Sequence, residues 1–369
     1  MKRYSITEPT LLIDEARARR NIHTMAEKAR CSGVRFRPHF KTHQSAAVGE
    51  WFREAGVSVI TVSSVAMAAY FARHGWRDIT LAFPVNVRQM EEINRLGGMI
   101  KLNLLVENEA TLGHLRRRLD HPVEIWLKVD TGYHRTGVWY EDAATLQALA
   151  RGIGQSPLMR LRGLLAHAGH AYQAHGRVEL EKIQAETISR LRQARDRVAD
   201  IGAGPLEISV GDTPCCGVVH RFEGMDEIRP GNFVFFDVMQ WQIGACGEEE
   251  LAAGLACPVV GIYPQRKELV IYGGAIHLSK ERIANPDGNE VYGYAVPWRG
   301  REWGPISRWR YVRSLSQEHG IVRLAPEEVA DWRVGDLVVI LPVHSCLTVN
   351  LMRRMRVVES GEWLATMNS

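Results

Sequence analysis

Short apolar runs alternate with helix-length amphipathic segments over the first two-thirds of the 369-residue chain. Eight of these runs read as strands, at residues 34–38, 57–62, 79–83, 100–106, 123–129, 161–167, 206–210 and 227–236. Helical patterns lie between them, at residues 45–55, 64–73, 87–96, 109–119, 142–152 and 177–199. Strands that alternate with helices indicate βαβ units and a parallel sheet. Because eight repeats close a (β/α)8 barrel, we expect an α/β fold of the TIM-barrel type, with an open doubly wound sheet as the alternative.

The pattern changes near residue 245. Strand-like runs then dominate, at residues 258–263, 269–272, 321–324, 337–341 and 355–358. Turns rich in glycine, proline and charge separate them, and no long helical period interrupts them. We therefore predict a barrel domain over residues 1–244 and a mostly β domain over residues 245–369, which also suits the length of the chain.

Composition argues against several classes of protein. The 46 basic and 42 acidic residues are intermixed and leave a formal net charge of only +4, so neither nucleic acid nor membrane is an expected partner. The first eight residues lack the apolar segment of a signal peptide, and no stretch is long and apolar enough to span a bilayer. The six cysteines show neither zinc-finger pairing nor a secreted disulfide framework, so we expect reduced thiols and a cytoplasmic protein.

In a (β/α)8 barrel the reactive side chains lie at the C-terminal ends of the strands. Polar or titratable residues follow several predicted strands: His39, Lys41 and His43 the first, His134 and Arg135 the fifth, His167 and His170 the sixth, and Gly211, Asp212, Thr213 and Pro214 the seventh, while Arg229, Gly231 and Asn232 interrupt the eighth. Lys41 is the most suggestive, because an amine that loses its proton on desolvation can form a Schiff base. Taken alone, it is more often a surface lysine.

The other strand ends are ambiguous one by one. Small residues and backbone N–H groups around Gly211 and Thr213 suit a phosphate, but a plain tight turn has the same composition. Arg229 is as typical of a structural salt bridge as of a partner for a ring nitrogen or an acid. His167 and His170, taken alone, are more often ordinary polar residues than catalysts.

His344 and Cys346 are the candidates for a metal site. In an extended chain their side chains point to the same side. Imidazole and thiolate together suit Zn²⁺ better than Mg²⁺ or Ca²⁺. Two ligands make only half of a structural zinc site, but they fit a catalytic metal whose other positions hold water, substrate or another side chain. A buried thiol beside a chance histidine would give the same pattern.

Together, these segments resemble the D-serine dehydratase and D-threonine aldolase family of fold-type III pyridoxal phosphate (PLP) enzymes, which are related to alanine racemase. The sequence Pro38-His39-Phe40-Lys41-Thr42-His43 is similar to that family's PLP-lysine segment. Further matches follow in the family's order: residues 129–138 resemble its DTGxxRxGV segment, 167–172 its xxGHxY segment, 212–214 its phosphate-side turn, 228–237 its RPGxYxxxD segment, 318–320 its EHG and 344–348 its metal site.

The resemblance implies a homodimer with a barrel and a C-terminal β domain, and a PLP cofactor that Lys41 holds covalently. It assigns the 5′-phosphate to Gly211, Thr213, Gly231 and Asn232, and the pyridine nitrogen to Arg229. It also assigns cofactor or substrate contacts to His39, His134, Arg135, His167 and Tyr172. His344 and Cys346 would hold a divalent metal, with Zn²⁺ favoured and Mn²⁺ as the alternative.

Two positions are informative within this family. Gln44 stands where many relatives carry a lysine, and Cys346 stands where D-threonine aldolases typically carry an aspartate. A cysteine there resembles the zinc-dependent dehydratases of D-serine and D-threo-3-hydroxyaspartate. We therefore expect a lyase that converts β-hydroxy D-amino acids to a 2-oxo acid and ammonia. The alternatives are an aldolase that yields glycine and an aldehyde, an amino-acid racemase with a second base beside Lys41, and a PLP-carrying homeostasis protein.

Overall fold

The computed structural model describes residues 5–199 and 205–369. The chain forms two compact units, and both are discontinuous in sequence. One consists of Met1–Ile22, Thr42–Val48 and Asn232–Ser369, and we call it the β unit. The other consists of His23–Lys41 and Gly49–Gly231, and we call it the barrel unit. The domain boundary expected between residues 244 and 245 stays a prediction.

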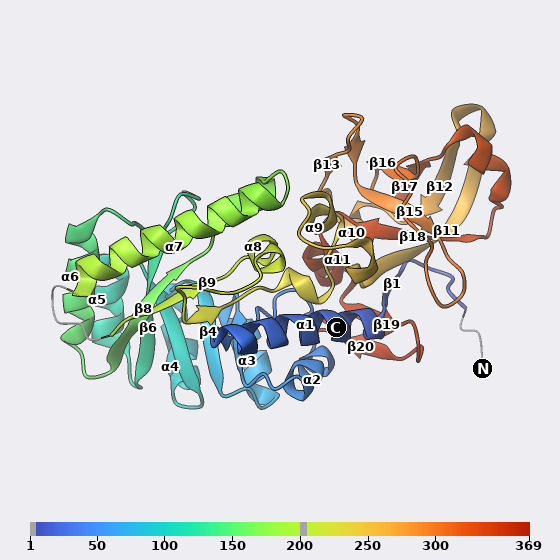
Figure 1. The fold of residues 1–369 in the computed structure, drawn as a ribbon. Coiled ribbons are helices and arrows are strands. Elements are labelled where there is room, and N and C mark those ends of the chain that lie inside the picture. The colour runs from blue at the N-terminus through green and yellow to red at the C-terminus, as the bar shows by residue number, and fades with distance from the viewer. Residues whose placement is uncertain (1–4, 200–204) are drawn as a thin grey trace. The chain divides into compact units, whose positions relative to one another are not determined.

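Among the described residues, eight parallel strands form the main series of the sheet in the barrel unit (Figure 1), and the short strand β7 (Val138–Trp139) pairs with β6 beside this series. Their spatial order is β2 (Arg35–Phe36), β10 (Glu227–Ile228), β9 (Glu207–Val210), β8 (Met159–Ala166), β6 (Val123–Asp130), β5 (Lys101–Val106), β4 (Asp78–Pro84) and β3 (Val59–Val62). A parallel bridge between His39 and Thr61 links the chain after β2 to β3, and so brings the two ends of the series together. The expected (β/α)8 barrel is confirmed.

Helices alternate with these strands along the chain. They are α1 (Glu15–Ser32), α2 (Ala46–Glu54), α3 (Val65–Arg73), α4 (Met90–Gly97), α5 (Glu109–Arg118), α6 (Ala143–Gly154), α7 (Arg177–Ala199) and the short α8 (Thr213–Val218). Ser64, Asn108 and Asp142 begin α3, α5 and α6, because each side chain accepts the backbone N–H three residues further on. No helix that the structure describes is long and apolar enough to cross a membrane.

The β unit contains a second sheet with its own barrel. The strand order is β12 (Glu268–Tyr272), β17 (His319–Arg323), β16 (Tyr311–Leu315), β15 (Gly293–Pro297), β18 (Leu337–Pro342), β11 (Ala253–Tyr263), β1 (Thr10–Ile13), β19 (Arg354–Val357) and β20 (Trp363–Ala365). Because β11 also pairs with β12, the strands from β12 to β11 close on themselves. The expected mostly β domain is confirmed. Figure 1 shows three short helices grouped beside these strands: α9 (Val238–Gln242), α10 (Ala275–Leu278) and α11 (Ser345–Met352).

Some local expectations were wrong. The strand predicted at residues 227–236 ends after Ile228, and Asn232–Val234 form a 3-10 helix. Pro230 explains the break, since proline has no N–H to donate to a strand ladder. The extended conformation assumed for residues 344–346 is also wrong, because His344 is the N-cap of α11 and Cys346 lies in its first turn. The strand β1 and the helix α1 were not predicted.

Candidate functional site

Lys41 comes directly after the bridge that closes the barrel. Phe40, the residue before it, is fully buried and packs against Phe52 and Trp76, with ring centroids 4.9 and 5.0 Å away. The backbone N–H of Lys41 donates to Nδ1 of His39 at 3.3 Å. These contacts hold the backbone at Lys41. Its side chain is exposed, so the desolvation that the sequence argument expected is not provided by the described protein atoms.

Arg229 is buried in the barrel unit, just past the end of β10. Its Nε donates to Oγ of Ser209 at 2.7 Å, and its Nη2 donates to the carbonyl of Ala166 at 2.6 Å. Both acceptors are neutral. Burial therefore lowers the pKa of Arg229 to about 10, although the charge of Glu227 acts in the opposite direction.

Lys128 is a buried cation in β6 that the sequence analysis missed. Its ammonium donates to the carbonyl of Val129 at 3.1 Å. Burial, with smaller contributions from the charges of Arg229 and Arg135, lowers the pKa of Lys128 to about 7. The signal was present in the sequence as a lysine inside an apolar run. Lys128, Arg229 and Lys41 together favour a bound anion. The negative charge of the PLP phosphate fits this requirement.

His167 follows β8 and is held in one orientation. Its Nδ1 makes a short hydrogen bond with the carbonyl of Gly211. Burial holds its pKa well below the usual value, and the charges of Lys41 and Arg135 add to the effect. The ring is therefore neutral, with the proton on Nδ1 and a free lone pair on Nε2. The ring of Tyr172 lies 6.2 Å from it.

Gly211, Thr213 and Gly231 come together in buried turns. The N–H of Gly231 donates to Oγ1 of Thr213 at 3.3 Å. A Cβ atom at position 211 would lie 2.7 Å from Cβ of Arg229, so the close approach of the two segments requires glycine. Asp212 begins α8 by accepting the N–H of Cys215 at 2.8 Å. Gly211, Thr213 and Gly231, which were predicted to bind the phosphate, therefore lie close together.

His134 and Arg135 lie in the turn after β6, and both side chains are exposed. Asp130 orders this turn, because its Oδ1 accepts the N–H of His134 at 3.0 Å and its Oδ2 lies 3.0 Å from Nδ1 of the same histidine. The guanidinium of Arg135 lies over the ring of Tyr133, 5.1 Å from the centroid. Their roles toward a substrate carboxylate stay predictions.

His344 and Cys346 meet at the N-terminal end of α11 in the β unit. Oδ2 of Asp237 lies 3.1 Å from Nδ1 of His344 and accepts the N–H of Ser345 at 2.9 Å. A carboxylate that binds one ring nitrogen leaves the other free for a metal, and such pairs are common around metal ions. Asp237 was not predicted as a site residue, although it ends the matched segment 228–237.

The side chain of Asn232, which was predicted at the phosphate, lies close to Cys346. The amide nitrogen of Asn232 donates to Oδ2 of Asp237 at 2.5 Å and to Sγ of Cys346 at 3.7 Å. Oγ1 of Thr42 lies 3.2 Å from the same sulfur. The side chain of Asn232 thus lies beside Cys346, one of the two predicted metal ligands. The assignment of Asn232 to the phosphate stays a prediction, and its backbone N–H would have to make that contact.

The charge of this group fits a cation. Burial lowers the pKa of His344, but the charges of Cys346 and Asp237 outweigh burial and raise that pKa to about 11. No group of three or more His, Cys, Asp or Glu that could hold a metal occurs in the described part of the chain. His344 and Cys346 would supply two protein ligands, so a metal held there would need further ligands such as water or substrate.

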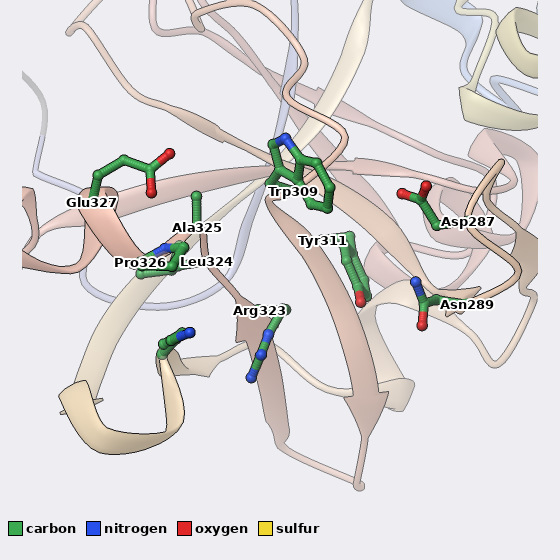
Figure 2. Close-up of a pocket in the computed structure, with 10 residues that line it drawn as sticks. Asp287, Asn289, Trp309, Tyr311, Arg323, Leu324, Ala325, Pro326 and Glu327 are labelled. Atoms are coloured by element: carbon green, nitrogen blue, oxygen red, sulfur yellow. The ribbon is translucent and has the colours of Figure 1, made fainter.

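A separate cavity of about 530 Å³ lies in the β unit (Figure 2). Its lining includes Lys267, Trp309, Tyr311, Arg323 and Glu327. None of the predicted site residues lines it, so it is not part of the candidate site.

Two family models match the chain. "Alanine racemase, N-terminal domain" matches residues 13–238, and "Putative serine dehydratase domain" matches residues 252–358. The chain belongs to the alanine racemase N-terminal domain family. This alanine racemase-like chain is 31% identical over 356 residues to the D-threo-3-hydroxyaspartate dehydratase of Delftia sp. (strain HT23), which covers 93% of this chain and 92% of the relative. It is 24% identical over 383 residues to the D-serine dehydratase of Dictyostelium discoideum, covering 96% and 94%.

Solved structures agree with the sequence relatives. The D-threo-3-hydroxyaspartate dehydratase from Delftia sp. HT23 matches with a TM-score of 0.91 and 28% identity, over 98% of each chain. A cysteine-to-alanine mutant of a D-threo-3-hydroxyaspartate dehydratase, solved in the metal-free form, also matches with a TM-score of 0.91. The alanine racemase-like chain is therefore a fold-type III PLP enzyme of the lyase class, related to D-amino acid dehydratases and aldolases.

Proposed function

We propose that this enzyme is a PLP- and metal-dependent dehydratase of β-hydroxy D-amino acids that releases a 2-oxo acid and ammonia. The pair of His344 and Cys346, oriented by Asp237, carries the proposal. A thiolate beside an imidazole favours Zn²⁺ over harder cations. The relative with 31% identity, a D-threo-3-hydroxyaspartate dehydratase, supports the same reaction. The metal-free form of a mutant dehydratase supports a metal in this group of enzymes.

The barrel unit would hold the cofactor. Lys41 would bind PLP covalently, and once released as a free amine it would take the proton from Cα of the substrate. PLP, when bound, stores the electrons that this proton leaves behind. The turns at Gly211, Thr213 and Gly231 would bind the phosphate, which the surrounding cations attract. Arg229 would approach the ring nitrogen.

Further side chains would complete the site. His39 and Tyr172 would flank the cofactor together with His167, whose neutral ring offers Nε2 as an acceptor. Arg135 and His134 would attract the carboxylate of the substrate, because both are exposed after β6. His344 and Cys346 would hold Zn²⁺, or Mn²⁺ as the alternative, and the metal supplies a Lewis acid for the β-hydroxyl. We also propose a homodimer, as the family resemblance implies.

Product analysis tests the proposal. The purified enzyme is incubated with D-threo-3-hydroxyaspartate, D-serine and D-threonine, and ammonia, 2-oxo acid, glycine and aldehyde are measured. We expect ammonia and a 2-oxo acid in equal amounts, lost on treatment with a chelator and restored by Zn²⁺. Glycine with an aldehyde would show an aldolase instead. This alternative is supported by the D-threonine aldolase of Arthrobacter sp., which is 24% identical to this chain. Conversion to the L-amino acid without these products would show a racemase.

A further inference from the structure

The segment after Lys41 contacts helix α11 at two points within the β unit. Oγ1 of Thr42 lies 3.2 Å from Sγ of Cys346, and the side-chain amide of Gln44 donates to Oδ1 of Asn350 at 3.3 Å. Cys346 and Asn350 are four residues apart in α11, so they lie on the same face of the helix. Residues 42–44 therefore run along the helix face that presents the predicted metal ligand.

Residues 366–369 add a third side to this contact. The backbone N–H of Met367 donates to the carbonyl of Gln44 at 2.7 Å. Nδ2 of Asn368 lies 3.1 Å from Oε1 of Gln44 and 3.3 Å from Oδ1 of Asn350. The side chains of Gln44, Asn350 and Asn368 thus bond to one another in a closed set, which we call the amide triangle.

Residues 366–369 also bind the C-terminal end of α11. Arg353 caps that end in the left-handed conformation, with a φ of 61°. Its carbonyl accepts the N–H of Thr366 at 3.1 Å and Oγ1 of Thr366 at 2.6 Å, and the hydroxyl of Ser369 donates to it as well. Residues 366–369 therefore join the C-terminal end of α11 to the segment that follows Lys41.

Gln44 itself requires such support. Its φ of 50° lies in the left-handed region, which is unfavourable for a residue with a side chain, and it is only 6% exposed. A lysine, which many members of the family carry at this position, has no acceptor atom and could not close the amide triangle. The amide triangle therefore depends on the glutamine that this chain carries at position 44.

We propose that residues 366–369 act as a clasp that positions residues 42–44 along α11. The clasp places the Thr42 hydroxyl at Cys346 and holds the peptide that follows Lys41. Gln44 and Asn368 are positioning residues in this scheme, because they act through Thr42 and through α11. For its effect on the metal, the clasp rests on the proposed function of His344 and Cys346.

Metal release tests the clasp. The holoenzyme is loaded with Co²⁺ or Zn²⁺, and loss of the metal to excess chelator is followed for the wild type, Gln44→Ala, Asn368→Ala and the double variant. Each single variant removes two of the three hydrogen bonds of the triangle. One such bond corresponds to roughly threefold to tenfold in an equilibrium constant, so each single variant should release metal faster by at least about that factor. The double variant should be little faster than either single variant, because both open the same triangle. The Co²⁺–thiolate absorption of Cys346 should also shift.

Two controls separate the clasp from general stability. Asn289→Ala removes another exposed asparagine of the β unit (Figure 2) and should release metal at the wild-type rate. Met367→Pro removes the N–H that binds Gln44, whereas Met367→Ala keeps it, so only the proline variant should behave like Gln44→Ala. Wild-type rates and an unshifted Co²⁺ absorption in Gln44→Ala and Asn368→Ala would overturn the proposal.

Hydrogen exchange distinguishes failure of the clasp from failure of the metal site. The backbone amides of residues 42–45 should exchange faster in Asn368→Ala than in the wild type, in protein without metal. If the wild type takes up no metal but this difference is found, the metal site is wrong and the clasp stands. If the wild type takes up metal but exchange and release rates are unchanged, the clasp is wrong and the metal site stands.

Discussion

At the scale of single residues, Lys128 shows how burial in the barrel changes the pKa of a charged side chain. Burial removes water from the ammonium group, and Arg229 and Arg135 repel it, so its pKa falls to about 7. In an unfolded chain the same amine has a pKa near 10.4. Between these two values the unfolded state binds more protons than the folded state. The contribution of Lys128 to the free energy of unfolding therefore rises with pH between about 7 and about 10.4. Below pH 7 the full cost of burying the charged amine is present.

Replacement of Lys128 by methionine should remove this pH dependence. Lys128→Met should be more stable than the wild type at pH 7, and the advantage should shrink by about 2 kcal/mol between pH 7 and pH 9. Urea denaturation at both pH values measures the difference. Lys182→Met, which alters an exposed lysine of α7, is the control and should show no such change. A pH-independent difference for Lys128→Met would contradict the lowered pKa.

Asp237 offers a second test at this scale. Its Oδ2 binds Nδ1 of His344, while its Oδ1 accepts the N–H of Gln240 and begins α9. Asn is also a good N-cap, so Asp237→Asn should preserve the helix. Loss of a carboxylate that orients a metal-binding histidine typically weakens metal affinity about 10–100-fold. We expect a loss in that range for Zn²⁺, measured by competition with a chromogenic chelator. The thermal unfolding midpoint should fall as well, because an amide NH2 in place of Oδ2 cannot accept from Asn232 and Ser345. Wild-type affinity would contradict the role given to Asp237.

At the scale of elements, a polar chain crosses the barrel between neighbouring strands. Oγ of Ser209 on β9 accepts from Nε of Arg229 and donates to Oε1 of Glu227 on β10 at 2.8 Å. Oε2 of Glu227 accepts from Nε of Arg37 at 2.6 Å, and both side chains are fully buried. Arg229 is therefore positioned through Ser209 by an ion pair deeper in the strands.

Loss of the Glu227 charge should destabilise the barrel. Removing one partner of a buried ion pair leaves the other charge uncompensated, which costs about 3–5 kcal/mol. Arg37 also pairs with Asp78, so we expect Glu227→Gln to lie near the lower end, about 3 kcal/mol. Glu207→Gln is the matched control, because Glu207 also pairs with arginines but is about a third exposed; it should cost less than about 1 kcal/mol. Equal losses in chemical denaturation would refute the assignment.

How far the sequence predicts this structure also differs from element to element. The strands of the barrel were predictable because they are buried apolar runs between amphipathic helices. The C-terminal part of the predicted strand 227–236 failed because apolar residues continue past Pro230 into a 3-10 helix. The helix α11 was missed because the run from Ser345 to Met352 is apolar and short, so periodicity could not distinguish it from a strand. The pairing of Asp237 with His344 joins residues 107 apart in the chain, and local patterns do not report such contacts.

At the scale of the whole molecule, the chain passes from one compact unit to the other next to proposed site residues. Lys41 ends one segment of the barrel unit and Thr42 begins a segment of the β unit. Gly231 and Asn232 mark another such change. A cut of the chain into an N-terminal and a C-terminal domain would therefore separate residues that belong to one compact unit. The β unit includes residues 42–48 as well as its C-terminal strands, and this interleaving was not visible in the sequence.

The covalent attachment of the cofactor to Lys41 is the central claim of this account. Borohydride reduction of the holoenzyme fixes PLP to the amine that holds it, and digestion followed by mass spectrometry locates the modified residue. We predict the modification on Lys41 in the wild type and in Lys128→Met, and none in Lys41→Ala, with loss of the visible absorption of the bound cofactor. Modification of another lysine in the wild type, including the buried Lys128 with its lowered pKa, would contradict the account.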